Sequence, residues 1–392
     1  MTVATPSAEL LTRLARPEAS GLPPYNAGLP SELVRSRYGV ERVIRLASNE
    51  SPFGASPAVA RALAALADQT SIYPDAACRD LRAAIATRCG TDADHVVIGN
   101  GSEDIVQMLC LAFLTPADHV LVQRPGFGLH EIYPRMMGAK IDAMVLTPSL
   151  EFHVDAWCAA LQRGPKLAFI ANPSNPVGCM FNAQEFARLL AATTDATLLV
   201  IDEAYYEYAR LAAGYPDTLA MLRAQPRPWI VLRTLSKGWG LAGLRVGYGI
   251  TSDVALVQLL DKVRTPFNAN SMAQAAALAA WGDESFMQQA ATQTVQARET
   301  LSRGLRALGV PGLRIAPSAT NFLFVDVGRS NGPVNEGLLQ CGILVKPWKE
   351  AGYENFIRVS IGSVPDNDLF LKVFRDVLAS QSRVARLCTQ SI

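Results

Sequence analysis

The feature that most constrains the fold of this sequence is a regular alternation of short apolar runs with longer helical patterns between residues 95 and 232. Several of these runs are apolar at consecutive positions, which is typical of strands buried on both faces of a sheet. The predicted strands are His95–Ile98, His119–Gln123, Lys140–Leu146, Leu167–Ile170, Leu198–Ile201 and Trp229–Leu232. The predicted helices between them are Ser102–Leu114, Leu129–Met137, Ala183–Ala192 and Pro216–Ala224. This order predicts an α/β domain with a mostly parallel sheet.

The pattern changes after Trp281. A long helical pattern over Glu284–Leu308 precedes shorter segments that indicate an α+β unit. Its predicted strands and helices are Arg314–Ala316, Asn321–Val327, Phe356–Ile361, Val334–Gln340 and Asp366–Ala379. Because the 392 residues exceed the roughly 250–300 that one core usually serves, we expect two domains. We predict an N-terminal arm over residues 1–45, a large domain over 46–283 and a small domain over 284–392.

The charge of the chain is almost balanced. Thirty-six Lys+Arg oppose 35 Asp+Glu, and 49% of the residues are apolar. This composition excludes a disordered chain, and it offers no positive excess for a general nucleic-acid binder. Charged residues interrupt the first twenty positions, and no stretch of about 18 uncharged apolar residues occurs. We therefore expect a cytoplasmic protein that binds neither membrane nor nucleic acid.

The cysteines and histidines do not follow the spacing of a metal site. The seven cysteines are odd in number and widely spaced without C-x-x-C, and the four histidines lack H-E-x-x-H or H-x-H. The sequence therefore predicts reduced thiols in a core and no bound metal.

The most specific motif is Thr234-Leu235-Ser236-Lys237-Gly238-Trp239-Gly240, which follows a predicted strand directly. A lysine that attacks an aldehyde must lose its proton easily, and nearby cations and desolvation promote that loss. Thr234, Ser236 and the downstream Arg245 are donors that a phosphate group would need. The alternative interpretation of this segment alone is a surface turn with a solvated lysine.

Two further motifs follow predicted strands. The strand Leu198–Ile201 ends in Asp202, as the acidic strand of a nucleotide hydrolase would, but no G-x-x-x-x-G-K-[ST] loop is present. The carboxylate could instead face a ring nitrogen and hold it protonated. The loop Asn172–Gly178 is rich in turn-forming residues, so it is either a rigid loop that presents Asn175 or an ordinary turn.

A fourth motif, Gly99-Asn100-Gly101-Ser102-Glu103-Asp104, lies between a predicted strand and a predicted helix. Free N–H groups at a helix start attract phosphate. The motif is not G-x-G-x-x-G, because Asp104 occupies the last glycine position, and its acids also suit a helix start without a ligand.

Together, the order and spacing of these motifs resemble the fold-type I pyridoxal-phosphate aminotransferases of class I/II. Within that group the chain is most similar to the histidinol-phosphate aminotransferases, over about residues 23–365. The resemblance includes Leu46–Gly54, Ile72-Tyr73-Pro74 and Phe356–Gly362. It implies a large domain with a mostly parallel seven-stranded sheet, a smaller α+β domain, bound pyridoxal 5′-phosphate and a homodimer with shared active sites.

The resemblance also implies a role for individual residues. Lys237 matches the lysine that forms the Schiff base with the cofactor, and Asp202 matches the partner of the pyridine nitrogen. Asn175 and Tyr205 match residues that hydrogen-bond the phenolic oxygen, and Tyr205 is predicted to be catalytic with Lys237 and Asp202. The implied phosphate ligands are Gly101, Ser102, Glu103, Thr234, Ser236 and Arg245, together with Tyr73 from the other subunit. Phe127 matches the aromatic residue over the ring face, and the implied substrate ligands are Arg358, Lys346, Tyr25 and Asn49.

The sequence departs from the family pattern at three positions. Lys346 stands where an arginine is usual, so the charge is kept but the bidentate fork is lost. His130 stands where a tyrosine is frequent, and Gly126 stands where threonine or serine is common. We expect all three departures to lie near the substrate side of the site.

The resemblance therefore implies an aminotransferase that exchanges an amino group between glutamate/2-oxoglutarate and a histidinol-phosphate-like substrate. The alternatives are an aminotransferase for aromatic or other amino acids in a specialised pathway, a pyridoxal-phosphate decarboxylase, and a binding module without cofactor.

Overall fold

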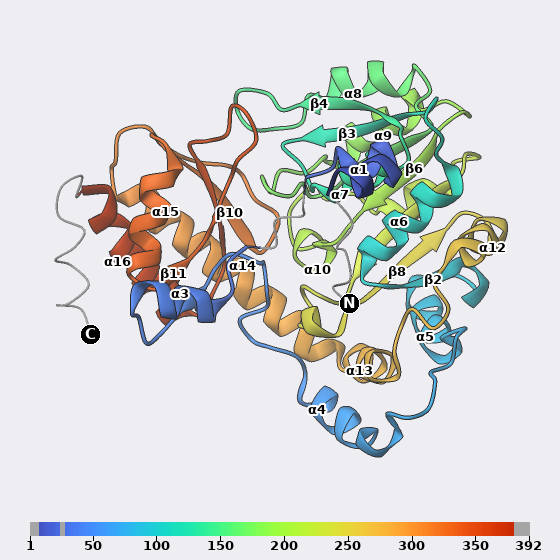
Figure 1. Cartoon of the computed structure of the whole chain (residues 1–392), viewed down its shortest axis with the longest axis horizontal. Coiled ribbons are helices and arrows are strands. Elements are labelled where there is room, and N and C mark those ends of the chain that lie inside the picture. The colour runs from blue at the N-terminus through green and yellow to red at the C-terminus, as the bar shows by residue number, and fades with distance from the viewer. Residues whose placement is uncertain (1–7, 24–27, 380–392) are drawn as a thin grey trace, which may run out of the picture.

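The computed structural model describes residues 8–23 and 28–379 (Figure 1). Its largest sheet has seven strands in the order β2-β8-β7-β6-β5-β3-β4. Neighbouring strands among β3, β4, β5, β6 and β7 are parallel, whereas β8 is antiparallel to both β2 and β7. The strands are β2 (Val96–Asn100), β3 (His119–Arg124), β4 (Lys140–Val145), β5 (Leu167–Ala171), β6 (Leu198–Asp202), β7 (Trp229–Thr234) and β8 (Val246–Thr251). The predicted mostly parallel sheet is confirmed.

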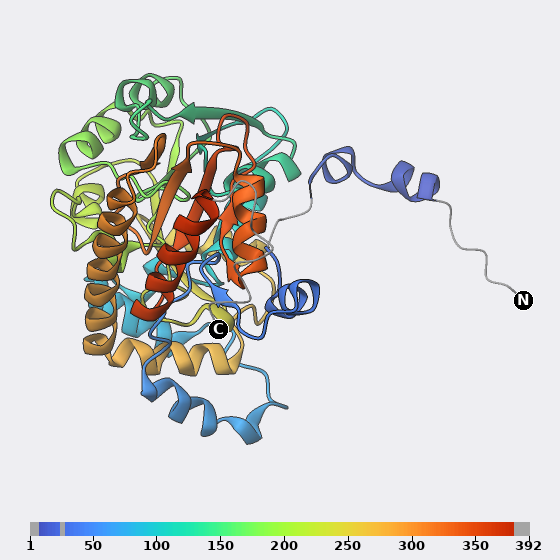
Figure 2. The same cartoon turned by 90° about the vertical axis from the view of Figure 1, so that its left-hand side faces the viewer.

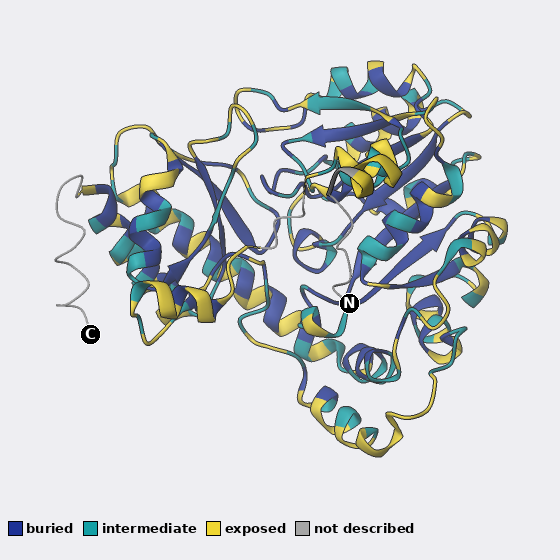
Figure 3. Ribbon diagram, viewed as in Figure 1, coloured by how far each residue is buried: buried dark blue, intermediate teal, exposed yellow. Residues whose placement is uncertain are grey.

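Helices cover both faces of this sheet, because alternate side chains of its strands enter two different apolar clusters. One cluster joins strand residues such as Val97 and Val200 to Ile105 and Leu260, and the other contains Ile201 on the opposite face. Figure 3 shows most strands of this sheet as buried, the edge strand β4 as intermediate and the outer helix faces as partly exposed. The helices of this part are α4 (Pro57–Ala64), α5 (Arg79–Cys89), α6 (Ser102–Phe113), α7 (Leu129–Met136), α8 (Val154–Leu161), α9 (Ala183–Ala192), α10 (Tyr206–Ala209), α11 (Thr218–Arg223), α12 (Val254–Val263) and α13 (Ser271–Gly282).

A second unit follows helix α14 (Glu284–Ala307). It contains a four-stranded antiparallel sheet in the order β12-β13-β10-β9, and its own apolar core. The four strands of this sheet are β9 (Leu313–Ile315), β10 (Phe322–Val327), β12 (Lys346–Pro347) and β13 (Phe356–Ser360). The other elements of the unit are α15 (Asn331–Gln340), β11 (Ile343–Leu344) and α16 (Val364–Ala379). The α+β pattern predicted after Trp281 is confirmed.

The N-terminal segment has two parts. Helices α1 (Ala8–Leu14) and α2 (Pro17–Ser20) project from the body of the molecule in Figure 2. Helix α3 (Ser31–Tyr38) and strand β1 (Ile44–Arg45) instead pack on the second unit, where β1 pairs in parallel with β11.

Strand β8 is the one strand of the large sheet that the sequence pattern did not predict, because Gly247 and Gly249 interrupt its apolar run. Gly247 is required by close packing: a Cβ there would collide with the backbone of Gly101 and Ser102. The glycine thus lets β8 lie directly against the start of α6. Among the described residues, no helix has the length and apolar character that crossing a bilayer requires.

Candidate active site

The carboxyl ends of β5, β6 and β7 open into a cleft of about 690 Å³ between the large sheet and the second unit. Parallel strands bring side chains that follow them to one edge of the sheet. The cleft is lined by most of the predicted site residues: Asn49, Ser102, Glu103, Phe127, Asn175, Asp202, Tyr205, Thr234, Ser236, Lys237, Arg245, Lys346 and Arg358. Three predicted residues are not among its lining: Gly101 lies directly before Ser102 at the start of α6, Tyr73 lies in another groove, and Tyr25 lies outside the described residues.

Lys237 lies just after β7, and its Nζ donates a hydrogen bond to the carbonyl oxygen of Ser48 at 3.0 Å. Removal of water from the amine lowers the pKa of Lys237 to about 8, and the positive charges of Arg358 and Arg245 act in the same direction. Glu50 opposes them by favouring the ammonium form. The amine can therefore lose its proton near neutral pH, as the chemistry of a nucleophilic lysine requires.

Asp202 ends β6, and His130 contacts it directly. Nε2 of His130 lies 3.0 Å from Oδ2 of Asp202, and less than a tenth of either side chain is exposed. The backbone N–H of Ala204 donates to the other carboxylate oxygen at 3.0 Å. The imidazole stacks on Phe169 with ring centroids 4.9 Å apart, and it meets the edge of Phe127.

The expectation for His130 was therefore wrong. This residue was expected near the substrate side, but the first turn of α7 carries its imidazole beneath Phe127 and onto the carboxylate of Asp202. The amphipathic pattern of α7 indicates that residue 130 is buried, but no sequence signal identifies Asp202 as its partner.

The start of α6 faces a group of hydroxyl and guanidinium donors. Thr234 Oγ1 donates to Ser236 Oγ at 2.9 Å, and Arg245 Nη1 donates to the same Ser236 oxygen at 3.4 Å. Arg245 Nη2 also lies 3.5 Å from a carboxylate oxygen of Glu103. Gly101 is favoured at this point by its φ of 81°, a conformation that L side chains rarely adopt, and a Cβ there would also displace the guanidinium of Arg245. Helix N–H groups, hydroxyls and a guanidinium in one place form a site for a phosphate group.

Tyr205 is held by Asn49, which the sequence predicted to bind substrate. Nδ2 of Asn49 donates to the Tyr205 hydroxyl at 2.9 Å, and Oδ1 of Asn49 accepts from Ser360 at 2.8 Å. Asn49 is only 1% exposed and has a φ of 56°, a left-handed conformation that asparagine tolerates better than most residues. Its amide thus joins Tyr205 to the sheet of the second unit.

Arg358 lies on the second unit and contacts the loop after β5. Its Nη1 donates to Oδ1 of Asn175 at 2.6 Å, and its Nη2 donates to the carbonyl oxygen of Ala47 at 2.6 Å. Lys346 is the residue opposite Arg358 in the β12–β13 pairing. Burial, together with the charges of Arg358 and Lys349, lowers the pKa of Lys346 to about 8. This wall of the cleft therefore concentrates positive charge.

Two further residues of the cleft are Gly126, which departs from the family pattern, and Glu350, which was not predicted. Gly126 cannot be serine or threonine with this backbone, because a Cβ would collide with the carbonyl oxygen of Gln123. Glu350 lines the cleft and was not predicted; it accepts a hydrogen bond from the Trp348 indole, and burial raises its pKa. No sequence motif marks Glu350.

Tyr73 is 78% exposed and stacks on Phe267 with ring centroids 4.5 Å apart. Its groove is formed by the segment Leu66–Pro74 and by the start of α13, so in this chain Tyr73 does not contribute to the main cleft. Within the described ranges 8–23 and 28–379, no group of three or more histidine, cysteine, aspartate or glutamate residues is arranged to hold a metal ion.

The residues of the cleft fit pyridoxal 5′-phosphate. The start of α6 offers donors for its phosphate, Asp202 offers a carboxylate, and Lys237 offers an amine whose pKa is lowered. Gly101 and Gly247 leave the helix start without the Cβ atoms that would displace the Arg245 guanidinium or the backbone of Ser102. This donor set is the chemistry that the phosphate, the ring nitrogen and the aldehyde of that molecule require.

Comparisons with known proteins agree with this geometry. The model of the family "Aminotransferase class I and II" matches residues 41–374. Histidinol-phosphate aminotransferase 3 of Rhizobium meliloti (strain 1021) is 42% identical over 368 residues, which are 94% of this chain and 98% of that protein. Histidinol-phosphate aminotransferase 1 of Mesorhizobium japonicum is 43% identical over 365 residues, which are 93% of this chain and 98% of that protein.

Among solved structures, the histidinol-phosphate aminotransferase of Sinorhizobium meliloti in complex with pyridoxal-5′-phosphate superposes with a TM-score of 0.84 and 28% identity. The match covers 93% of this chain and 97% of that one. From its motifs, its fold and these relatives, the chain belongs to the class I and II aminotransferases.

Proposed function

We propose that this protein is a pyridoxal-phosphate-dependent aminotransferase that exchanges an amino group between glutamate/2-oxoglutarate and a histidinol-phosphate-like amine. The observation that carries the proposal is that one cleft holds two arginines, Arg245 and Arg358, whose charges both lower the pKa of Lys237. Each arginine marks one cationic end of the cleft. One end would hold the cofactor phosphate, and the other would hold an anionic group of the substrate. The printed names of the relatives support this choice of substrate.

The residue roles proposed for the cofactor follow the donors that line the cleft. Asp202 would face the ring nitrogen, Phe127 would cover the ring, and Asn175 and Tyr205 would face the phenolic oxygen. The phosphate would take its hydrogen bonds from Gly101, Ser102, Glu103, Thr234, Ser236 and Arg245, with the main-chain N–H groups contributed by the first turn of α6.

Lys237 is the proposed acid–base group. In its neutral form Nζ would accept the proton that the substrate loses from Cα. As the ammonium, the same group would donate that proton again within the cleft. The cofactor, when bound, supplies the delocalisation of negative charge that makes this proton acidic. Desolvation and two cations hold the pKa of Lys237 at about 8, so the amine exchanges protons in both directions near neutral pH.

Hydrogen bonds from neighbouring residues position the side chains of Asp202 and Tyr205. Hydrogen bonds from His130 and from Ala204 N–H fix the carboxylate plane of Asp202. Ser360 of the second unit orients Asn49, and Asn49 donates to the Tyr205 hydroxyl, so the second unit helps to fix that hydroxyl.

Arg358 and Lys346 are the proposed ligands of the substrate anion. Arg358 offers a planar fork, whereas Lys346 offers a point charge. A phosphate monoester and the carboxylates of glutamate could use the same pair in alternate half-reactions. Tyr25 stays a predicted substrate ligand outside the described residues.

An aminotransferase for aromatic or other amino acids is the second candidate, and Lys346 favours it. A lysine there lacks the bidentate grip on phosphate that arginine would provide. His130 does not favour this candidate, because its imidazole contacts Asp202.

We further propose a homodimer, a location in the cytoplasm and the domain limits 1–45, 46–283 and 284–392. The exposed Tyr73–Phe267 pair supports the dimer, because two stacked aromatic rings on a surface are typical of an interface. Tyr73 would then reach the cofactor phosphate of the partner subunit.

One assay distinguishes the candidates. The purified protein is incubated with 2-oxoglutarate and a panel of amines that includes histidinol phosphate and phenylalanine, while glutamate and carbon dioxide are measured. Glutamate from histidinol phosphate but not phenylalanine supports the proposal, and the reverse supports the second candidate. Carbon dioxide without glutamate would contradict both and indicate a decarboxylase.

A further inference from the structure

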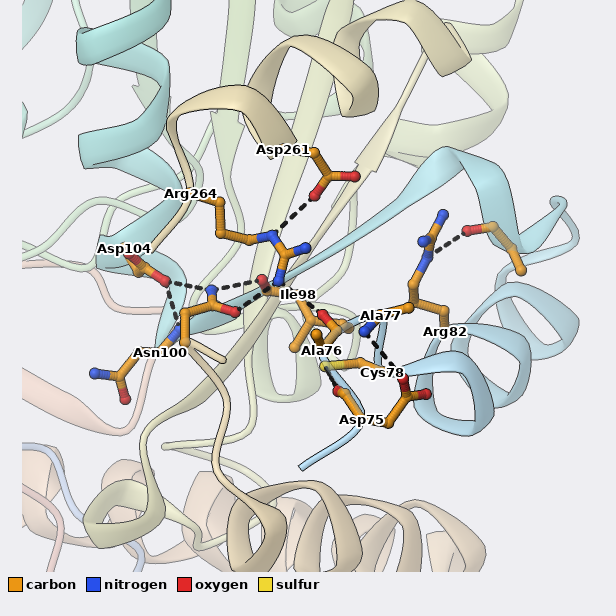
Figure 4. A network of polar contacts seen from close by, with 12 residues as sticks. Asp75, Ala76, Ala77, Cys78, Arg82, Ile98, Asn100, Asp104, Asp261 and Arg264 are labelled. Carbon is orange, nitrogen blue, oxygen red and sulfur yellow. Dashed lines mark hydrogen bonds and ion pairs between the residues drawn. The ribbon is translucent and has the colours of Figure 1, made fainter. Parts of the chain in front are cut away.

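The loop between α12 and α13 contacts the phosphate-binding end of the cleft from behind. Its residue Asn268 lies outside every motif that the sequence analysis identified, yet its side chain reaches strand β2 and helix α6. Nδ2 of Asn268 donates to Oδ2 of Asp104 at 2.7 Å and to the carbonyl oxygen of Ile98 at 3.1 Å. Figure 4 shows Ile98, Asp104 and Arg264 converging on this point.

Asp104 connects this amide to the turn that precedes α6. The same Oδ2 atom accepts a hydrogen bond from the backbone N–H of Asn100 at 2.9 Å. Asn100 is followed by Gly101 and Ser102, whose backbone begins the phosphate-binding helix end. The carboxylate of Asp104 therefore fixes the direction of the turn that presents the N–H groups of α6.

The Asn268 amide is itself held in one orientation. Its oxygen accepts a hydrogen bond from Arg264 Nη1 at 3.2 Å, so the oxygen faces a cation and the nitrogen faces two acceptors. Arg264 is anchored in turn by the carbonyl oxygen of Ala76 and by the carboxylate of Asp261, both at 2.8 Å. An amide flip would place like groups together at all three contacts.

We propose that Asn268 is a positioning residue for the cofactor phosphate, which acts through Asp104 on the turn before α6. The inference rests on the cofactor binding proposed above. Asn268 would not touch the phosphate. It would hold Asp104 so that the N–H groups of the first turn of α6 keep the directions that the phosphate needs.

The test compares variants of the holoenzyme. Asn268→Asp keeps the size of the side chain but replaces both donors with acceptors and places a second carboxylate against Asp104. We expect the release of pyridoxal phosphate from this variant, trapped and measured by absorbance, to be about tenfold faster than from the wild type, because a hydrogen bond to a charged group is lost. The ³¹P resonance of the bound phosphate should also shift.

A double variant separates positioning from general damage. Asp104→Ala removes the acceptor that Asn100 N–H and Asn268 share, so adding Asn268→Asp to it should speed release no further than Asp104→Ala alone if Asn268 acts through Asp104. The matched control is Asn182→Ala, which removes the N-cap of α9 on another part of the chain. This control should lower thermal stability without changing cofactor release.

Two results would overturn the inference. One is a wild-type release rate and ³¹P resonance in folded Asn268→Asp, and the other is equal acceleration in the Asn182→Ala control. If the wild-type protein binds the cofactor and transaminates, either of these results would reject only the positioning role of Asn268. The proposed function would then stand.

Discussion

Nε2 of His130 lies 3.0 Å from Oδ2 of Asp202, and both side chains are buried at the carboxyl edge of the large sheet. This contact joins the first turn of α7 to the last residue of β6. It makes the orientation of the proposed ring-nitrogen partner depend on a residue from a different βα unit.

The first prediction concerns this pair. His130→Phe keeps an aromatic ring that can stack on Phe169 but removes the hydrogen bond to Asp202. We expect the single-turnover rate to fall about tenfold, because a buried carboxylate oxygen loses its partner, while KM for the amine changes little. His153→Ala, which affects the N-cap of α8, is the control and should keep the wild-type rate. A His130→Phe enzyme with an unchanged rate would refute the role.

The second prediction concerns the titration of Lys237. Because its pKa lies at about 8 instead of 10.5, the neutral amine accumulates as the pH rises through about 8. The rate at which the protein without cofactor combines covalently with added pyridoxal phosphate should therefore rise with pH and level off above this value. Stopped-flow absorbance would measure it, and Lys237→Ala should show neither the reaction nor turnover. A rate that keeps rising through the ordinary lysine pKa of 10.5 would contradict the lowered value.

The sequence predicted the elements of the site better than their contacts. The strand that ends in Asp202 and the strand that precedes Lys237 were predicted within two residues, because a strand buried on both faces leaves an unbroken apolar run. Strand β8 was missed because its glycines, needed for close approach to α6, weaken that run. Among the helices around the large sheet, α4, α5, α8, α10 and α12 were also not predicted.

The contacts of His130, Asn49 and Asn268 could not be read from the chain. Each joins segments that lie far apart in the sequence, and no local period records which acceptor an imidazole or amide will meet. The family resemblance supplied residue types for the cofactor, but it led us to expect His130 near the substrate side, whereas its imidazole contacts Asp202. Tertiary packing of α7 against β5 and β6 decided that position.

The third prediction concerns the substrate anion. The pKa of Lys346 is lowered to about 8, so Lys346 loses its positive charge as the pH rises through this value. KM for a phosphate-bearing amine should therefore increase above pH 8 in the wild type. Lys346→Arg should remove this increase and lower KM about threefold to tenfold, because the guanidinium stays charged and forms a fork. Lys372→Arg on α16 is the control and should leave the pH profile unchanged. If Lys346→Arg retains the wild-type pH profile, Lys346 does not hold the substrate anion.

The fourth prediction concerns the exposed aromatic pair. Phe267→Glu places a charge beside Tyr73 on the surface that we propose as the subunit contact. Burying an unpaired carboxylate in an interface is costly, so we expect sedimentation velocity to show dissociation of the dimer at concentrations where the wild type stays paired. Activity should fall when the dimer dissociates, because Tyr73 could no longer reach the partner's site.

The control is Val145→Glu, which introduces the same charge at an exposed apolar residue on β4, an edge strand of the large sheet, and should leave the dimer intact. A Phe267→Glu protein that sediments as the wild-type dimer would exclude this surface as the contact, and a wild-type protein that is active as a monomer would exclude the dimer itself.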